Sequence, residues 1–462
     1  MAHNLVERLT HELGASGVLT DPDVTAGYSR DMMPLAQVGR PLAVVLPESA
    51  EQIQAIVRLC AEAGVPIVPR GAGSGLTGAA NAIDGCVVLV TTKLNRILEI
   101  DTGNRLAVVE PGVVNLDLRT AVEKEGLFYA PDPSSYDWCT IGGNLSTNAG
   151  GLCCVKYGVT TDAVLGLDVV LADGELLRTG RRTVKGVAGY DLTKLFIGSE
   201  GTLGVITKAT VALRPLPQAP CTLVAAFDDL SSAGDAVSAV VREGLVPSLM
   251  EIMDHTSIEA AERYLRTELG AGTGSAALLL CQSDAGGEAA RQEIAKLEQI
   301  CTTAGASLVH STTDLAEGQM LLQARRVVLT ALELYGTWLT DDVGVPRTRI
   351  TELMTACQRI GEEVGLRVAV LGHAGDGNMH PTIVYNAADE DEFARARKAF
   401  NEILRVGLEL GGTVTGEHGV GKIKQDWLAT EIGPIGIRTH RAIKAALDPG
   451  NLFNPGSMFS MD

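Results

Sequence analysis

The stretch Pro69-Arg-Gly-Ala-Gly-Ser-Gly-Leu-Thr-Gly78 decides the fold of this chain. It contains the spacing Gly-x-Gly-x-x-Gly, which marks a Rossmann fold when a helix follows directly and an acidic residue lies about 20 positions further on. Here the chain continues through Ala79–Asp84 into the apolar run Cys86–Val90, which predicts a strand. We therefore reject the Rossmann fold and expect a loop whose successive N–H groups converge on an anion.

A second glycine-rich stretch, Thr140-Ile-Gly-Gly-Asn-Leu-Ser-Thr-Asn-Ala-Gly-Gly151, has the same character. It offers four hydrogen-bond donors: Gly142, Gly143, Asn144 and Ser146. Two such loops can bind both ends of one large cofactor that contains phosphate. The alternative is that both are only glycine-rich turns, and a third stretch of this kind, Gly198–Gly204, argues against it.

The spacing of apolar residues predicts the elements around these loops. We expect a helix that begins after Ser49 and ends at about Gly64, and another that Asn115 caps and that ends near Gly126. Strands are expected at Ala43–Leu46, Val65–Val68, Arg96–Ile100, Leu106–Val109, Gly166–Ala172 and Gly204–Leu213.

The proline-rich stretch Arg214–Pro220 predicts a domain boundary, because proline interrupts regular structure. Beyond it, the predicted strands alternate with helices and lie at Thr222–Phe227, Ala276–Cys281 and Leu366–Leu371. The clearest helix covers about residues 390–410, and a last helical segment covers Ala442–Leu447.

The composition is that of a globular protein of two or three domains, with 462 residues of which 46% are hydrophobic and 20% charged. A net charge of −18 argues against nucleic acid as a general partner. The nine cysteines, an odd number in apolar or glycine-rich contexts, predict reduced thiols in a cytoplasmic protein. No signal-peptide pattern and no apolar run of about 18 residues is present, so we expect no transmembrane segment.

Two histidine-containing motifs point to a metal site: His373-Ala-Gly-Asp-Gly-Asn-Met-His380 and Gly416-Glu417-His418-Gly-Val-Gly-Lys422. Two imidazoles and the Glu417 carboxylate can hold a divalent metal and leave coordination positions open. Zinc is favoured, and manganese and iron are alternatives. His418 is the candidate for proton transfer, because imidazole titrates near neutral pH. The alternative is that these are ordinary loop histidines.

These motifs, in their order along the chain, resemble an FAD-linked dehydrogenase family. The glycine-rich stretches, with Tyr157-Gly158, resemble the FAD domain of the vanillyl-alcohol-oxidase type. The histidine motifs, with the ending Asp448–Gly456, resemble the C-terminal domain of D-lactate, glycolate and D-2-hydroxyglutarate dehydrogenases. The resemblance covers about residues 38–459.

The resemblance implies an α+β protein with a vanillyl-alcohol-oxidase (p-cresol methylhydroxylase, PCMH)-type FAD-binding domain and a substrate, or cap, domain. The cap domain is expected to hold an antiparallel sheet flanked by helices. The implied parts are an N-terminal helical lead-in (1–37), the FAD-binding domain (38–215), the cap domain (216–415) and a segment that returns to the FAD domain (416–462).

The resemblance also implies which residues bind FAD. The pyrophosphate is expected to bind at Gly71, Ala72, Gly73, Ser74, Gly75, Leu76, Thr77, Gly78, Gly142, Gly143, Asn144 and Ser146. The flavin and adenine are expected to lie along Pro131, Ser134, Asn148, Gly151, Gly201 and Ile206. Further cofactor-binding residues are Arg70, Thr140, Tyr157, Glu200 and Asn454. Relatives with covalent FAD carry a histidine in the first loop, where this chain has Ser74, so we predict non-covalent FAD.

The implied reaction oxidises a D-2-hydroxy acid to the 2-oxo acid, with hydride transfer to flavin N5. His373, His380 and Glu417 would hold the metal, and His418 would take the hydroxyl proton. Arg325 would bind the substrate carboxylate, although Arg326 competes for that role and Arg325 is alternatively a solvated helix residue.

Two positions bear on the substrate. D-2-hydroxyglutarate dehydrogenases carry a lysine and an asparagine where this chain has Thr340 and Thr382. Since those groups hold polar parts of the substrate, we favour D-lactate, glycolate or a longer monocarboxylic acid. The alternative is D-2-hydroxyglutarate, with Arg326, Arg347 or Lys422 in compensation.

Two other classes compete with an oxidoreductase. Alkyl-glycerone-phosphate synthases share the fold but carry a run of histidines where this chain has Gly416-Glu417-His418. A metal-dependent hydrolase would explain the histidines but not the glycine loops.

Since neither an NAD-binding unit nor a cysteine cluster is visible, the electron acceptor is expected to be a separate protein, a quinone or a dye. Partners beyond the hydroxy acid and this acceptor are open, a homodimer among them.

Overall fold

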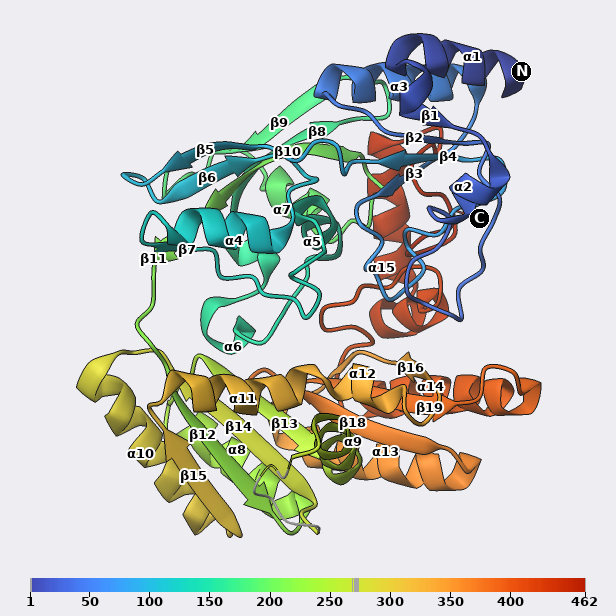
Figure 1. Cartoon of the computed structure of the whole chain (residues 1–462). Coiled ribbons are helices and arrows are strands. Elements are labelled where there is room, and N and C mark those ends of the chain that lie inside the picture. The colour runs from blue at the N-terminus through green and yellow to red at the C-terminus, as the bar shows by residue number, and fades with distance from the viewer. Residues whose placement is uncertain (1, 268, 270–273, 462) are drawn as a thin grey trace. The chain divides into compact units, whose positions relative to one another are not determined.

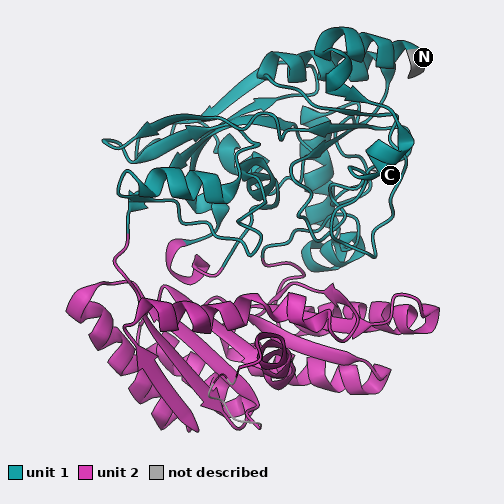
Figure 2. Cartoon of the chain, in the orientation of Figure 1, with its two compact units in different colours: residues 1–151, 158–216, 417–462 teal, residues 152–157, 217–416 magenta. Residues whose placement is uncertain are grey.

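The computed structural model describes residues 2–267, 269 and 274–461 of the chain (Figure 1). The chain forms two compact units, coloured separately in Figure 2. Unit 1 consists of residues 1–151, 158–216 and 417–462, and unit 2 of residues 152–157 and 217–416. The boundary between residues 216 and 217 thus falls inside the proline-rich stretch Arg214–Pro220, while the short excursion 152–157 has no signal in the sequence.

The first sheet of unit 1 has the strand order β1-β2-β4-β3, in which β2, β4 and β3 run parallel. Its strands are β1 (Val18–Leu19), β2 (Ala43–Val45), β3 (Ile67–Arg70) and β4 (Val87–Val90). Helix α3 (Ala50–Ala63) makes the crossover from β2 to β3. As predicted, the Ser49 hydroxyl accepts from the N–H of Gln52 at its start, and Gly64 ends it with a φ of 65°.

The second sheet of unit 1 is antiparallel, in the order β5-β6-β10-β8-β9. Its strands are β5 (Ile97–Asp101), β6 (Leu106–Val109), β8 (Val164–Val170), β9 (Leu176–Gly180) and β10 (Val205–Ala212). A two-stranded ribbon pairs β7 (Leu127–Phe128) with β11 (Arg214–Pro215). The remaining elements of unit 1 are α1 (Ala2–Leu13), η1 (Ala15–Gly17), α2 (Pro22–Ala26), α4 (Asn115–Glu123), α5 (Ile141–Thr147), η2 (Thr160–Ala163), α7 (Leu192–Phe196) and α15 (Gln425–Leu447).

Three expectations for unit 1 need correction. Val114, not Asn115, precedes α4, because the Asn115 side chain donates to Asn144 and to the carbonyl of Pro131 instead of capping the helix. The second glycine-rich stretch is not an open loop, since Ile141–Thr147 form α5 behind a Thr140 cap. The last helical segment is the end of the longer helix α15, which is interrupted at Gly433 before Pro434.

Unit 2 contains an antiparallel sheet in the order β15-β12-β14-β13-β18-β19-β16, with β17 also paired to β19. Its strands are β12 (Cys221–Phe227), β13 (Leu249–Asp254), β14 (Ala277–Ser283), β15 (Leu308–Thr312), β16 (Thr337–Thr340), β17 (Val343–Gly344), β18 (Arg367–His373) and β19 (Asn378–Tyr385). Its helices are α6 (Cys154–Tyr157), α8 (Leu230–Arg242), α9 (His255–Leu265), α10 (Gly287–Thr303), α11 (Leu315–Arg326), α12 (Val328–Leu332), η3 (Arg347–Arg349), α13 (Ile350–Val364) and α14 (Glu390–Glu409).

Helices cover both faces of this sheet, which explains why its central strands are apolar without alternation. Ile258 of α9, Leu322 of α11 and Val328 of α12 share one core with Met253 and Leu371 of the sheet. Helices α8, α10, α13 and α14 also contact the strands (Figure 1). The expected antiparallel sheet flanked by helices is therefore present.

A buried lysine holds the C-terminal segment in unit 1. Lys444 of α15 donates to the carbonyl oxygens of Thr202 (2.7 Å) and Phe453 (2.8 Å) and pairs with Asp448, which is itself fully buried. The Asp448 carboxylate also accepts from the N–H groups of Leu452 and Phe453. This ion pair thus connects α15, the chain after it and the glycine-rich stretch at Thr202.

Replacing Lys444 with alanine should destabilise the protein by about 3 kcal/mol or more, because the Asp448 carboxylate would stay buried without its counter-charge. Urea unfolding followed by circular dichroism measures this change. The matched control is Arg438→Ala on the exposed side of the same helix, which should cost less than about 0.5 kcal/mol. Equal stability of the two variants would contradict this role for Lys444.

Candidate active site

The first glycine-rich loop of unit 1 presents a run of unpaired backbone donors. Among the described residues, no protein acceptor pairs with the N–H groups of Gly71 through Thr77. The hydroxyl of Thr77, buried at 1% exposure, is also without a partner. Such a run of N–H groups is suited to the oxygen atoms of a phosphate group. The loop therefore fits the pyrophosphate of FAD.

A buried guanidinium adds positive charge to this loop. A Cβ atom on Gly73, where φ is 85°, would lie 2.0 Å from Nη2 of Arg70, so only glycine allows this approach. Burial lowers the pKa of Arg70, and the charge of Asp31 opposes that effect. Asp31 also accepts from the N–H of Gly78 (2.8 Å) and so fixes the end of the loop.

The second glycine-rich segment lies against the first. A Cβ atom on Gly71 would come within 2.4 Å of the Thr140 hydroxyl. However, its expected donors already have partners within the protein. The N–H of Gly142 donates to Pro111 O (2.7 Å), that of Gly143 to the Thr140 hydroxyl (3.3 Å), and the Ser146 hydroxyl to Gly142 O (2.8 Å). Pyrophosphate binding by this segment stays a prediction.

The predicted residues near position 200 join these two segments. The N–H of Glu200 donates to Ser146 O (2.8 Å), and the Asn454 amide donates to the carbonyls of Ala79 (2.9 Å) and Glu200 (2.8 Å). A Cβ atom on Gly201 would contact Pro69 at 3.1 Å. The structure thus brings the first loop, α5, the Gly198–Gly204 stretch and Asn454 together in unit 1.

The other predicted flavin residues occupy varied positions. Pro131 and Ile206 are buried, Ser134 is exposed, and Asn148 adopts a left-handed conformation. Gly151 is crowded by Asp132. Tyr157 belongs instead to unit 2, where its hydroxyl bonds to the Asp284 carboxylate.

The motif that contains Glu417 and His418 is fastened within unit 1. The Glu200 carboxylate accepts from the N–H groups of Val420 and Gly421, each at 2.7 Å. The Lys422 N–H donates to Thr77 O (2.9 Å). Nε2 of His418 is 3.8 Å from Oε1 of Glu417, and both side chains are mostly buried. The motif therefore contacts the first glycine-rich loop of the same unit.

The two other histidines of the predicted metal site lie in unit 2, in the hairpin of β18 and β19. His373 ends β18, and His380 is the third residue of β19. Both are buried, and their ring centroids are 5.1 Å apart with the planes at 86°. The sequence motif thus places the two imidazoles side by side.

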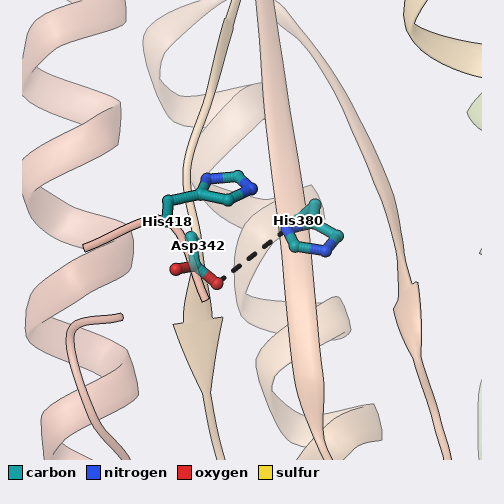
Figure 3. Close-up of side chains that lie close together, drawn as sticks. All are labelled: Asp342, His380 and His418. Atoms are coloured by element: carbon teal, nitrogen blue, oxygen red, sulfur yellow. Dashed lines mark ion pairs between the residues drawn. The ribbon is translucent and has the colours of Figure 1, made fainter. Parts of the chain in front are cut away.

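Each imidazole has a buried carboxylate beside it. His373 Nδ1 is 2.6 Å from Oε1 of Glu251, and His380 Nδ1 is 4.0 Å from Oδ1 of Asp342. Figure 3 shows the Asp342 carboxylate directed toward the His380 ring; His418, also labelled there, belongs to unit 1. The hydrogen bond of Glu251 to His373 is of the kind that orients imidazole ligands in metal sites, so the donor set fits a divalent metal.

Asp342 has a second role in unit 2. Its Oδ2 atom accepts from the Thr415 hydroxyl (2.6 Å) and from the N–H of Gly416 (2.9 Å). The carboxylate beside His380 thus also holds the backbone immediately before Glu417.

Arg325 is not a solvated helix residue. It is 6% exposed, and its Nε donates to Oε2 of Glu251 at 2.8 Å. Arg326, its competitor, is exposed.

Thr340 and Thr382 face each other on β16 and β19. Their hydroxyls are 3.0 Å apart, and both residues are buried. They bond to each other and present no charge.

Sequence reasoning missed Glu251 and the function of Asp342. A signal for Glu251 exists in Leu249-Met-Glu-Ile-Met-Asp254, where two acids interrupt an apolar strand. A carboxylate in such a strand must be buried with a partner, because an unpaired buried charge is costly. The sequence does not say which partner.

Comparisons with known proteins agree with this geometry. Residues 41–180 match the family model "FAD binding domain", and residues 216–458 match "FAD linked oxidases, C-terminal domain". The glycolate oxidase subunit GlcD of Bacillus subtilis is 43% identical over 97% of this chain and 95% of its own length. The D-lactate dehydrogenase of Anaerostipes hadrus is 35% identical over 97% of this chain and 95% of its own length.

Solved structures show the same fold. A p-cresol methylhydroxylase superposes with a TM-score of 0.82 at 21% identity, over 99% of this chain and 97% of its own. An alkyldihydroxyacetonephosphate synthase superposes with a TM-score of 0.76 at 19% identity, over 98% of this chain and 84% of its own. At these identities the likeness concerns the fold alone.

The matched FAD-binding model defines an FAD-binding protein, and its fold is like that of p-cresol methylhydroxylase. The chain belongs to the family of FAD-linked oxidases. It is therefore an FAD-linked oxidoreductase, and a hydrolase with structural glycine loops is set aside. In addition, no helix in the described part of the chain combines the length and apolar character needed to cross a membrane.

The buried Glu200 carboxylate, which accepts from Val420 and Gly421, should make the stability of the folded protein depend on pH. Burial raises the pKa of Glu200 to about 7 from 4.5, although the N–H groups of Val420 and Gly421 oppose the shift. The folded state therefore holds the proton more tightly than the unfolded state. The resulting stabilisation is complete below pH 4.5 and is lost as pH rises to about 7, an effect of up to about 3 kcal/mol.

Urea unfolding of the wild type and of Glu200→Gln across this pH range measures the effect. The stability of the wild type relative to Glu200→Gln should fall as the pH rises from 4.5 to about 7. Glu123→Gln, at an exposed position of α4, is the control and should follow the wild type. Parallel pH profiles for the wild type and Glu200→Gln would contradict the prediction.

Proposed function

We propose that this enzyme oxidises a short D-2-hydroxy monocarboxylic acid, with D-lactate and glycolate favoured, to the 2-oxo acid. The observation that carries the proposal is the buried pair His373 and His380, each beside a carboxylate, in an FAD-linked oxidase. Such a pair suits a metal that binds the hydroxyl group of a substrate. The relatives named glycolate oxidase subunit and D-lactate dehydrogenase support the substrate class.

In this proposal His373, His380 and Glu417 hold one divalent metal, with zinc favoured over manganese and iron. Two neutral imidazoles and one carboxylate are a common ligand set for these metals. Glu417 directly follows Gly416, whose N–H is bonded to Asp342, the carboxylate beside His380. This connection supports Glu417 as the third ligand.

When bound, the metal would supply Lewis acidity at the substrate hydroxyl, and FAD would supply the hydride acceptor. His418 takes the hydroxyl proton as general base. Arg325 uses its terminal nitrogens for the substrate carboxylate, while its Nε stays on Glu251. Because Arg325 is buried, water is excluded, and its ion pair with the substrate carboxylate is strengthened.

The threonine pair supports a substrate with one carboxylate. Thr340 and Thr382 occupy the positions at which D-2-hydroxyglutarate dehydrogenases carry lysine and asparagine, and here the two hydroxyls bond to each other. A second substrate carboxylate near them would lack a counter-charge. D-2-hydroxyglutarate is therefore the alternative substrate, and the synthase-type transfer reaction is the alternative of another class.

Anaerobic mixing with candidate acids tests the proposal. The flavin absorbance near ~450 nm should be lost with D-lactate or glycolate, and much more slowly with L-lactate or D-2-hydroxyglutarate. Prior treatment with EDTA should prevent the loss, and added Zn²⁺ or Mn²⁺ should restore it. Bleaching that is unaffected by EDTA, or fastest with D-2-hydroxyglutarate, would contradict the metal or the substrate assignment, respectively.

Two histidine variants, one in the proposed metal site and one outside it, test the metal directly. His373→Ala should slow flavin reduction by at least about 100-fold while FAD remains bound, because the residues predicted for FAD lie mainly in unit 1. The matched control is His310→Ala, an exposed histidine of β15 in the same unit, which should behave as the wild type. Full activity of the metal-free His373→Ala variant would refute the metal mechanism.

The cofactor should be dissociable, because Ser74 offers no side chain for a covalent bond to the flavin. Precipitation of the protein with acid should leave the yellow colour in the supernatant. A yellow polypeptide after denaturation would contradict this prediction.

A further inference from the structure

The Glu251 carboxylate lies between two residues of the proposed site. Its Oε1 is 2.6 Å from Nδ1 of His373, and its Oε2 accepts from Nε of Arg325 at 2.8 Å. The Glu251 side chain is 1% exposed, so water does not compete for either bond. All three residues belong to unit 2.

The register of the sheet produces this contact. Glu251 of β13 and His373 of β18 are directly opposite each other in an antiparallel pair, so their side chains point to the same face. That face also carries Met253 and Leu371, which share a hydrophobic core with Leu322 of α11. Arg325, in the last turn of α11, therefore reaches the same carboxylate from above the sheet.

We propose that Glu251 is the positioning residue that couples the metal ligand His373 to the substrate-binding arginine Arg325, an inference that rests on the proposed function. A carboxylate only accepts hydrogen bonds, so Nδ1 of His373 carries the ring proton and Nε2 is the atom left for a metal. The same carboxylate prevents rotation of the Arg325 side chain. One residue thus sets the orientation of both.

Charge balance explains why this arrangement can be buried. The guanidinium of Arg325 neutralises the carboxylate of Glu251, and the imidazole of His373 adds no charge as a donor. The region presents a neutral imidazole to a cation, as metal binding requires. With Glu251 absent, Arg325 would remain as a buried charge with no other carboxylate paired to it among the described residues, and His373 would lose its fixed ring position.

Glu251→Gln tests the proposal with little change in volume. Zn²⁺ affinity is measured by competition with a chelating dye on the FAD-containing protein, without substrate. The expected result is a 10- to 100-fold loss of affinity, roughly the range known for changes beside metal ligands. KM for the hydroxy acid should also rise, because Arg325 is less well held. The control is Glu259→Gln, which removes an exposed carboxylate paired with Arg367 in the same unit and should change neither value.

The outcomes separate this inference from the proposed function. A wild type that binds no Zn²⁺ would overturn the proposed metal site itself. A wild type that binds Zn²⁺ with a folded Glu251→Gln variant of equal affinity would overturn the inference alone. If the variant does not fold, long-range ¹H–¹⁵N spectra of the metal-free wild type decide. A proton on Nδ1 of His373, assigned through His373→Gln, supports the proposal, and a proton on Nε2 refutes it.

Discussion

The antiparallel register of β13, β18 and β19 is the constraint on which the candidate site of unit 2 depends. Side chains alternate between the faces of a sheet, so directly opposite residues share a face. In this register Glu251 is opposite His373, and Leu371 is opposite His380. A slip of one residue in either pairing would turn one partner to the other face of the sheet. The apolar neighbours of these residues, packed against α9, α11 and α12, make such a slip costly.

The two units offer different kinds of groups to the ligands that we expect them to bind. Unit 1 offers backbone N–H groups from a glycine-rich loop, which need no side-chain ordering and suit the diffuse charge of a pyrophosphate. Unit 2 offers buried side chains, whose charges are tolerated only because they are paired, as in Arg325 and Glu251. The first arrangement requires left-handed glycines such as Gly73, and the second requires a register that brings distant charges together.

The fold is shared with a p-cresol methylhydroxylase at 21% identity, and a fold by itself does not fix the reaction. Differences in substrate must therefore come from side chains on the shared framework. In the proposed function the pair Thr340 and Thr382 would be such a difference, because two hydroxyls that bond to each other leave neither a charge nor a strong donor.

Local sequence patterns determined the features that contiguous residues form. The Ser49 cap, the helix end at Gly64, the loop of unpaired N–H groups and the proximity of His373 to His380 depend on spacing within short segments, and the sequence predicted them. Even locally, Asn115 was wrong as a cap, because its side chain bonds to the distant residue Asn144. Only the tertiary structure decided which groups support the histidines. Glu251 lies 122 positions from His373 and 74 from Arg325. Residues so far apart in sequence meet only through strand pairing and helix packing, which no local pattern encodes.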